Sequence, residues 1–202
     1  MRKHLLNRLY NFHWIVPGEA ARSSQSYLKM LAPFLHANGL RAVINLRGHH
    51  PQFPWWDYEN AICAREGVAH LDAMMDSRRL PLRAMLVALL DAFERAPKPF
   101  LLKCSGGQDR TSFAAALYLV HRDGWTALEH AQRQFRALPY LHFPRPRQRW
   151  LRAFLPLAKE MAQGRPLAQW VRESYDPDEF ARLLPAETFN GVWEPWKPRQ
   201  TR

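Results

Sequence analysis

Apolar and polar segments alternate along the chain, and the short apolar segments predict strands. The segment 41–46 contains three consecutive apolar residues, as a strand in the centre of a sheet requires. A further pair of short segments flanks the turn signal Pro17-Gly18. The predicted strands cover residues 12–16, 20–23, 41–46, 68–71 and 99–102.

Apolar residues at helical spacing predict helices between the strands. In the segment 26–37, which Asn38-Gly39 ends, Pro33 is a candidate kink. The apolar positions of that segment are Leu28, Leu31, Phe34 and Leu35. Further helices are predicted over 56–66, from Pro81 onwards, after residue 112, from a cap at Thr126 to Arg136, and from Trp150 onwards. This alternation indicates an α/β fold with a central, mostly parallel sheet flanked by helices on both faces.

The length of 202 residues and the hydrophobic content of 47% are sufficient for one well-packed core. We expect one domain over residues 1–163 and a C-terminal extension over 164–202 that packs on it. The extension contains Trp170, Trp193 and Trp196, and aromatic residues in such a tail usually attach it to the core. A contact with a partner or a membrane is the alternative.

The formal net charge of +11 is large and comes mainly from arginine. Such a field attracts phosphorylated substrates, nucleic acid or anionic lipid surfaces. Because the arginines are scattered rather than gathered in runs, nucleic acid is an unlikely partner, and an anionic lipid surface remains a candidate.

The two cysteines, Cys63 and Cys104, do not form a disulfide framework of the secreted type and favour a reducing compartment. The basic N-terminus is not followed by an apolar stretch or a small-residue cleavage site. No segment approaches the roughly 18–20 apolar residues of a membrane span. These observations predict a cytoplasmic protein, unless it attaches peripherally to a membrane.

The segment from Lys103 to Thr111 carries the main chemical signal. It places Cys104 six positions before Arg110, with glycines between them, where the strand 99–102 leads into an apolar helix. A short loop on a helix N-terminus turns its N–H groups inward and can bind an oxyanion. Those groups also favour a thiolate, and a guanidinium can bind two oxygens of one phosphate. The segment therefore favours phosphate-ester hydrolysis through a cysteinyl-phosphate.

This interpretation depends on the context of the cysteine, because arginine is abundant enough for the spacing to occur by chance. The second cysteine, Cys63, has Ala69 at the same offset and lies in an ordinary amphipathic segment. The alternative for Cys104 is a small buried side chain in a glycine-rich turn.

Several residues of this segment resemble the signature His-Cys-x-x-Gly-x-x-Arg-Ser/Thr of the cysteine-dependent protein tyrosine and dual-specificity phosphatases. The matching positions are Cys104, Gly107, Arg110 and Thr111. Lys103 stands where the signature has histidine. The wider chain, from about residue 11 to about residue 160, looks like the small bacterial dual-specificity type, which implies a phosphatase-like catalytic domain over 1–163.

The resemblance implies a role for each matching residue. Cys104 would attack phosphorus, Arg110 would bind the phosphoryl oxygens, and Thr111 would assist the thiolate as leaving group. The loop that would bind the phosphate consists of Ser105, Gly106, Gly107, Gln108 and Asp109. An upstream aspartate would protonate the leaving oxygen and then activate water.

Two aspartates lie at a suitable distance before Cys104 for the role of general acid. Asp72, 32 residues upstream, ends a predicted strand, whereas Asp76, 28 residues upstream, lies in the loop that leads to Pro81. Position in a loop favours Asp76.

Other polar residues are candidates for the rim of the pocket. Arg47, His49 and His50 follow the central strand, and ligands of open α/β sheets bind at the carboxyl ends of strands. The histidines are not completed to a metal site by other ligands in the sequence, and the proposed chemistry needs neither a metal nor a cofactor. Gln132 and Gln134 are expected to face solvent, and the alternative is that they reach the pocket and position water.

The interior of the loop has no lysine or arginine before Arg110, which favours a singly phosphorylated substrate: a phosphotyrosine or phosphoserine/threonine protein, or a small phosphomonoester. The form Cys-x-x-Gly-x-Asp-Arg-Thr is also similar to loops of phosphoinositide phosphatases, and Arg78 and Arg79 could supply positive charge. A phosphoinositide or phospholipid headgroup is therefore the alternative.

Lys103 leaves open a weakly active, phosphate-binding pseudophosphatase, and a rhodanese-like sulfurtransferase is a third class.

Overall fold

The computed structural model describes residues 2–27, 29–49 and 54–195, and its centre is a five-stranded sheet. The strands are β1 (His13–Val16), β2 (Ala20–Ser23), β3 (Ala42–Asn45), β4 (Ala69–Asp72) and β5 (Phe100–Lys103). Their order is β1-β2-β5-β3-β4, with β1 and β2 antiparallel and the other neighbours parallel. The mostly parallel sheet is thus confirmed, and each predicted strand is found with its ends shifted by at most one residue.

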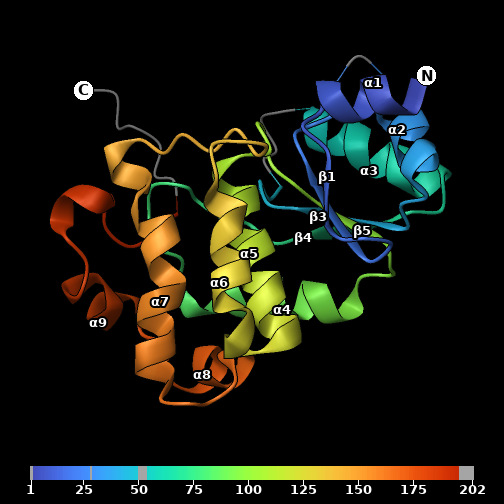
Figure 1. Cartoon of the computed structure of the whole chain (residues 1–202). Coiled ribbons are helices and arrows are strands. Elements are labelled where there is room, and N and C mark those ends of the chain that lie inside the picture. The colour runs from blue at the N-terminus through green and yellow to red at the C-terminus, as the bar shows by residue number, and fades with distance from the viewer. Residues whose placement is uncertain (1, 28, 50–53, 196–202) are drawn as a thin grey trace.

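Helices cover both faces of the sheet (Figure 1). They are α1 (Arg2–Leu9), α2 (Leu31–Asn38), α3 (Trp55–Arg65), α4 (Arg83–Arg95), α5 (Asp109–Asp123), α6 (Leu128–Gln132), α7 (Trp150–Ala162), α8 (Leu167–Glu173) and α9 (Pro177–Arg182). Short 3₁₀ turns occupy Trp125–Ala127, Arg133–Phe135, Pro146–Gln148 and Ala186–Thr188.

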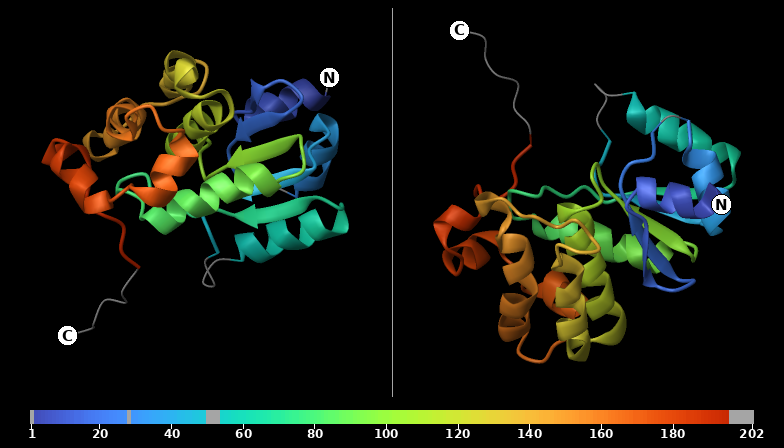
Figure 2. Two further views of the ribbon diagram at one scale, coloured as in Figure 1. Left: turned by 90° about the horizontal axis from the view of Figure 1, so that it is seen from below. Right: turned by 45° about the horizontal axis from the view of Figure 1, so that its top comes forward.

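The alternation of side chains along the strands divides the interior into two cores. Ile44 and Leu102 point to the face covered by α4, α5 and α7, while Val43 and Leu101 point to the face covered by α1, α2 and α3. Figure 2 shows the sheet between these two groups of helices. Helix α5 is deeply enclosed, since residues 111–120 are all buried, and it fixes the end of the loop that precedes it.

Two predicted helices differ from those observed. Helix α2 begins at Leu31 rather than near residue 26, so Pro33 lies in its first turn, where a missing N–H costs nothing and no kink follows. Leu28 lies outside the described residues. The predicted helix 126–136 is interrupted, because α6 is flanked by two 3₁₀ turns, and Thr126 donates to the carbonyl of Asp123 instead of capping a helix.

The residues after Gly164 pack into the larger core. Trp170, Tyr175 and Phe180 are buried beside Phe154 of α7. The Tyr175 hydroxyl donates to the carbonyl of Pro81 at 2.8 Å. Of the three tryptophans named for this segment, Trp170 lies in the core, and Trp196 lies outside the described residues.

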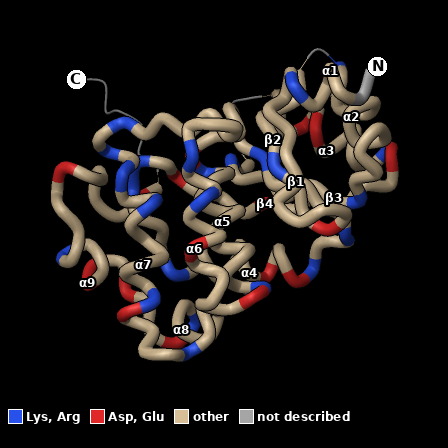
Figure 3. Tube along the Cα trace, in the orientation of Figure 1, with Lys and Arg blue, Asp and Glu red and all other residues tan. Residues whose placement is uncertain are grey.

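Positive charge is spread over many elements, and acidic residues lie among the basic ones (Figure 3). Among the described residues, no helix has both the length and the apolar character needed to cross a membrane.

Candidate active site

The loop between β5 and α5 is held against the end of β2. Gly107 has φ +65°, and a Cβ there would lie 2.5 Å from the backbone nitrogen of Ser24. The backbone N–H of Gln25 donates to the carbonyl of Ser105 at 3.1 Å. Only glycine combines this backbone conformation with so close an approach, so Gly107 determines the path of the loop.

A buried arginine supports the loop from behind. Arg22 of β2 is completely buried, and its Nη2 donates to the Gly107 carbonyl at 2.9 Å and to the Ser112 hydroxyl at 2.8 Å. Its Nη1 donates to Oε1 of Gln134 at 2.9 Å. Burial lowers the pKa of Arg22 to about 10. Arg22 therefore holds the Gly107 carbonyl on the side of β2.

Cys104 lies buried at the base of the loop, where its thiol is surrounded by donors. Thr111 Oγ1 donates to Sγ at 3.0 Å. Burial by itself raises the pKa of the Cys104 thiol, but the charge of Arg110, the Thr111 hydroxyl and the N–H groups of Gln108 and Gly107 outweigh it, so that the pKa is lowered. The site therefore favours the thiolate, which is the nucleophilic form.

A pocket of about 330 Å³ lies beside the loop and collects several of the predicted residues. Arg110, Arg47, Asp76 and Arg78 line it together with Met74, Met75 and Ser77. Arg110 donates to the Ser105 hydroxyl at 3.0 Å. These residues are distant in sequence, and the fold brings them into one pocket.

The two candidate acids occupy different places. Asp72 is exposed at the end of β4 and accepts from Asn45 Nδ2 at 2.7 Å and from the Trp56 indole at 2.9 Å. Asp76 accepts from the backbone N–H of Arg78 at 2.6 Å, with its side chain in the pocket. Of the two, Asp76 shares a pocket with Arg110.

The residue in the place of the usual histidine belongs to a buried polar network. Lys103 Nζ lies 2.6 Å from Glu59 Oε1 and donates to Gln25 Oε1 at 2.8 Å. Gln25 in turn donates to Glu59 at 2.7 Å and accepts from Arg47 at 3.3 Å. His70 Nε2 lies 2.9 Å from Glu59. Burial lowers the pKa of Lys103, while the charge of Glu59 opposes this.

Asp109, the acidic residue of the loop, is connected to the segment that contains Asp76. Gln148 Nε2 lies 2.9 Å from Asp109 Oδ2 and 3.1 Å from the hydroxyl of Ser77. Gln148 therefore links the cysteine loop to the residue next to the candidate acid.

Gln134 and several supporting residues lie where the sequence did not predict them. Gln134 is buried against Arg22 rather than facing solvent, and Gln132 is half-buried. His49 packs on the ring of Trp56 at 4.2 Å, and His50 lies outside the described residues. The missed residues are Arg22, Gln25, Glu59 and Gln148. An arginine inside a short strand was a signal for Arg22, whereas the others showed none.

The comparisons with known proteins identify the fold. No protein-family model matches the chain, and no curated protein matches it in sequence. Among solved structures, a mutant form of Tk-PTP is 19% identical, covering 75% of this chain and 97% of its own, with a TM-score of 0.58. PTPMT1 is 18% identical over 75% and 98%, with a TM-score of 0.55. TpbA from P. aeruginosa is 18% identical over 87% and 91%, with a TM-score of 0.52. All three are cysteine-based phosphatases.

Proposed function

We propose that this chain, which has the fold of the cysteine-based phosphatases, hydrolyses phosphate monoesters through a cysteinyl-phosphate. The observation that carries the proposal is the buried Cys104 thiol, which accepts from Thr111 at 3.0 Å and has a lowered pKa at the base of a loop that ends in Arg110. A buried cysteine with only a packing role would not need this set of donors.

The reaction follows from these groups in two steps. In the first, Cys104 Sγ forms a bond to phosphorus while the bond from phosphorus to the ester oxygen breaks, and Asp76 gives its proton to that oxygen. In the second, water attacks phosphorus, Asp76 takes the proton of the water, and the thiolate of Cys104 leaves with the help of the Thr111 hydroxyl. Arg110 and the N–H groups of residues 105–109 bind the phosphoryl oxygens in both steps.

Asp76 is proposed as the acid in preference to Asp72. Its side chain lines the same pocket as Arg110, whereas Asp72 is bound to Asn45 and Trp56 at the edge of the sheet. A general acid must reach the leaving oxygen within hydrogen-bonding distance, directly or through one water.

Two kinds of substrate suit the proposed reaction. The absence of lysine and arginine from the loop before Arg110 supports a phosphotyrosine or dual-specificity protein phosphatase. The arginines of the pocket, Arg47 and Arg78, favour a second candidate, a phosphoinositide or phospholipid-headgroup phosphatase. Solved complexes of proteins with this fold include TpbA with pTyr and PTPMT1 with PI(5)P.

Hydrolysis of p-nitrophenyl phosphate tests the proposed reaction. We expect turnover in the wild-type protein and its loss in Cys104→Ser and in Arg110→Ala. An unchanged rate in Cys104→Ser would disprove the cysteine mechanism. Binding of vanadate without turnover would indicate a pseudophosphatase, and consumption of thiosulfate without phosphatase activity would indicate a sulfurtransferase.

A further inference from the structure

The pocket beside the cysteine loop holds more positive charge than one phosphate requires. Arg110 is sufficient to bind the phosphoryl group in the proposed reaction, yet Arg47 and Arg78 line the same pocket. In the part of the chain that the structure describes, none of these three guanidinium groups lies within ion-pair distance of a carboxylate.

Arg47 is held in position by an aromatic ring and an amide oxygen. Its guanidinium packs on the Trp55 ring at 3.7 Å from the ring centre and donates to Gln25 Oε1 at 3.3 Å. Burial lowers the pKa of Arg47, and the nearby charge of Arg110 lowers it further, while Tyr27 and Glu59 oppose this. A preorganised cation that is repelled by a second cation is a favourable place for an anion.

The carboxylates near the pocket are not available to neutralise these arginines. Glu59 is bound to Lys103 at 2.6 Å and to His70 at 2.9 Å. Asp76 Oδ1 accepts from the backbone N–H groups of Arg78 and Arg79, so this oxygen is engaged by the backbone of its own loop.

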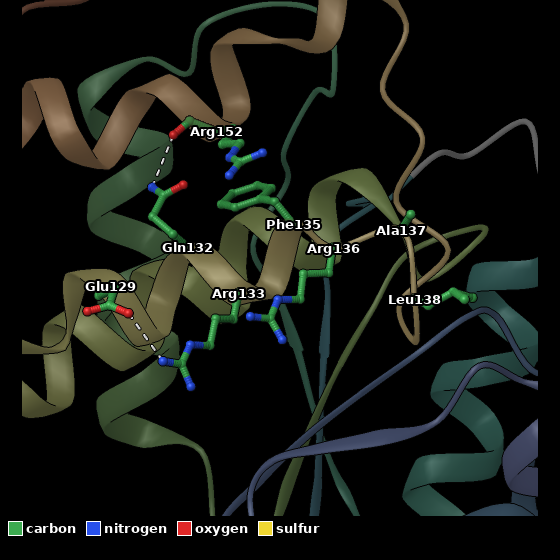
Figure 4. Close-up of a pocket in the computed structure, with 8 residues that line it drawn as sticks. All are labelled: Glu129, Gln132, Arg133, Phe135, Arg136, Ala137, Leu138 and Arg152. Atoms are coloured by element: carbon green, nitrogen blue, oxygen red, sulfur yellow. Dashed lines mark hydrogen bonds and ion pairs between the residues drawn. The ribbon is translucent and has the colours of Figure 1, made fainter.

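Another basic pocket of the molecule shows the contrast (Figure 4). It is lined by Arg133, Arg136 and Arg152, but there Arg133 forms an ion pair with Glu129 at 3.2 Å. Both residues of that pair are exposed, so the pocket lies on a solvated surface. It shares no lining residue with the pocket beside Arg110.

We propose that Arg47, assisted by Arg78, binds a second phosphate group of the substrate while Arg110 and the loop bind the first. The substrate class is then a phosphomonoester that carries another phosphate, ester or diester, on the same small carrier or lipid headgroup. A volume of about 330 Å³ suits such a carrier, and Met74 and Met75 offer it apolar contacts. This inference rests on the proposed function and selects its second candidate.

Matched substrate pairs test the inference. The soluble pair is myo-inositol 1-phosphate and myo-inositol 1,4-bisphosphate. The vesicle pair is phosphatidic acid, which has no second phosphate, and phosphatidylinositol 5-phosphate, which has one. We expect the wild-type protein to favour the second member of at least one pair in kcat/KM, and Arg47→Met to reduce that preference by roughly 10–100-fold, as the loss of a charge-assisted hydrogen bond does. The pair that shows the preference identifies the source of the ligand as soluble or lipid.

Two further variants make the result specific. Arg47→Lys keeps the charge but loses the stacking on Trp55, so an intermediate preference is expected. Arg152→Met removes the same charge from the exposed pocket of Figure 4 and should leave both the rates and the preference unchanged. An equal effect of Arg152→Met would mean that net charge alone acts, and it would overturn the proposal.

The inference can fail separately from the proposed function. Turnover of p-nitrophenyl phosphate with no preference in either pair, or with the same preference in Arg47→Met, would overturn the second-phosphate site and leave the phosphatase intact. If none of the substrates is turned over, the affinities of the two inositol phosphates for the Cys104→Ser variant test the second-phosphate site. Calorimetry should then show tighter binding of the bisphosphate than of the monophosphate, and equal affinities would overturn the inference.

Discussion

Lys103 Nζ lies 2.6 Å from Glu59 Oε1, and the two side chains are among the most buried in the molecule. Lys103 immediately precedes Cys104, so this ion pair anchors the strand residue from which the cysteine loop starts. Gln25 extends the anchor, since it contacts both members of the pair and also binds the loop through its backbone N–H.

Removal of the ammonium group should strongly destabilise the protein. In Lys103→Met the carboxylate of Glu59 stays buried with less compensation, and we expect a loss of about 3–5 kcal/mol in the free energy of unfolding by urea. The double variant Lys103→Met/Glu59→Gln should recover part of this loss.

Lys98→Met is the matched control for this prediction. Lys98 pairs with Glu19 at 2.7 Å, but half of its side chain is exposed, so a loss of at most about 1 kcal/mol is expected. Equal losses in Lys103→Met and Lys98→Met would contradict the structural role of the buried pair.

A methyl group at Gly107 should displace the loop. The Cβ of Gly107→Ala would lie 2.5 Å from Ser24 N at a φ of +65°, and such strain costs roughly 1–3 kcal/mol or moves the loop. We expect a large drop in kcat for p-nitrophenyl phosphate. Gly106→Ala is the control, because its Cβ would meet nothing closer than 3.6 Å and should leave kcat nearly unchanged. Similar rates in the two variants would contradict the geometry.

The Cys104 thiol should react as a thiolate below the pH at which an ordinary cysteine does, because its pKa is lowered. Alkylation by iodoacetamide, followed against pH, should have its midpoint below the usual value of about 8.5. Thr111→Val removes one donor to Sγ and should move the midpoint upward. Cys63 is an internal control, since burial raises the pKa of its thiol to about 12 and it should stay unlabelled.

The lowered pKa of Cys104 also makes the stability of the folded protein depend on pH. A thiol whose pKa is lower in the folded state stabilises that state fully above its unfolded pKa, and this contribution disappears as the pH falls through the folded pKa. The thiolate contribution should therefore weaken on acidification from about pH 8.5. In the alkylation experiment, a midpoint pH for Cys104 at or above that of a free cysteine would contradict the lowered pKa.

Asp76→Asn should slow the reaction by about 10²–10⁴-fold with alkyl phosphates, whose leaving group needs a proton, and less with p-nitrophenyl phosphate. One limb of the pH–rate profile should disappear as well. Asp72→Asn is the control and should keep both the rate and the profile. The reverse result would assign the acid role to Asp72.

The sequence could predict the parts of the site that are contiguous. Cys104, Gly107, Arg110 and Thr111 lie within one short segment between a strand and a helix, so their spacing and chemistry are visible in the sequence itself. The strands were also predictable, because buried strands give short apolar runs.

The supporting contacts were not predictable, because they join residues that are distant in sequence. Arg22 meets Gln134 across 112 positions, and Lys103 meets Gln25 across 78. Glutamine is usually found at the surface, and Gln134 is buried only because the fold brings it against Arg22. The start of α2 was predicted too early, because the described residues 26, 27, 29 and 30 are not helical and the helix begins at Leu31.

The proposed mechanism requires that the phosphoryl group is covalently bonded to Cys104 Sγ before water releases it. Rapid quenching of the protein with excess p-nitrophenyl phosphate, followed by peptide mass spectrometry, tests it most directly, and the slower Asp76→Asn variant should increase the yield. We predict one added phosphoryl group on the peptide that contains Cys104, and none on this peptide in Cys104→Ser. Turnover with the phosphoryl group on another residue, or undiminished turnover in Cys104→Ser, would contradict the account.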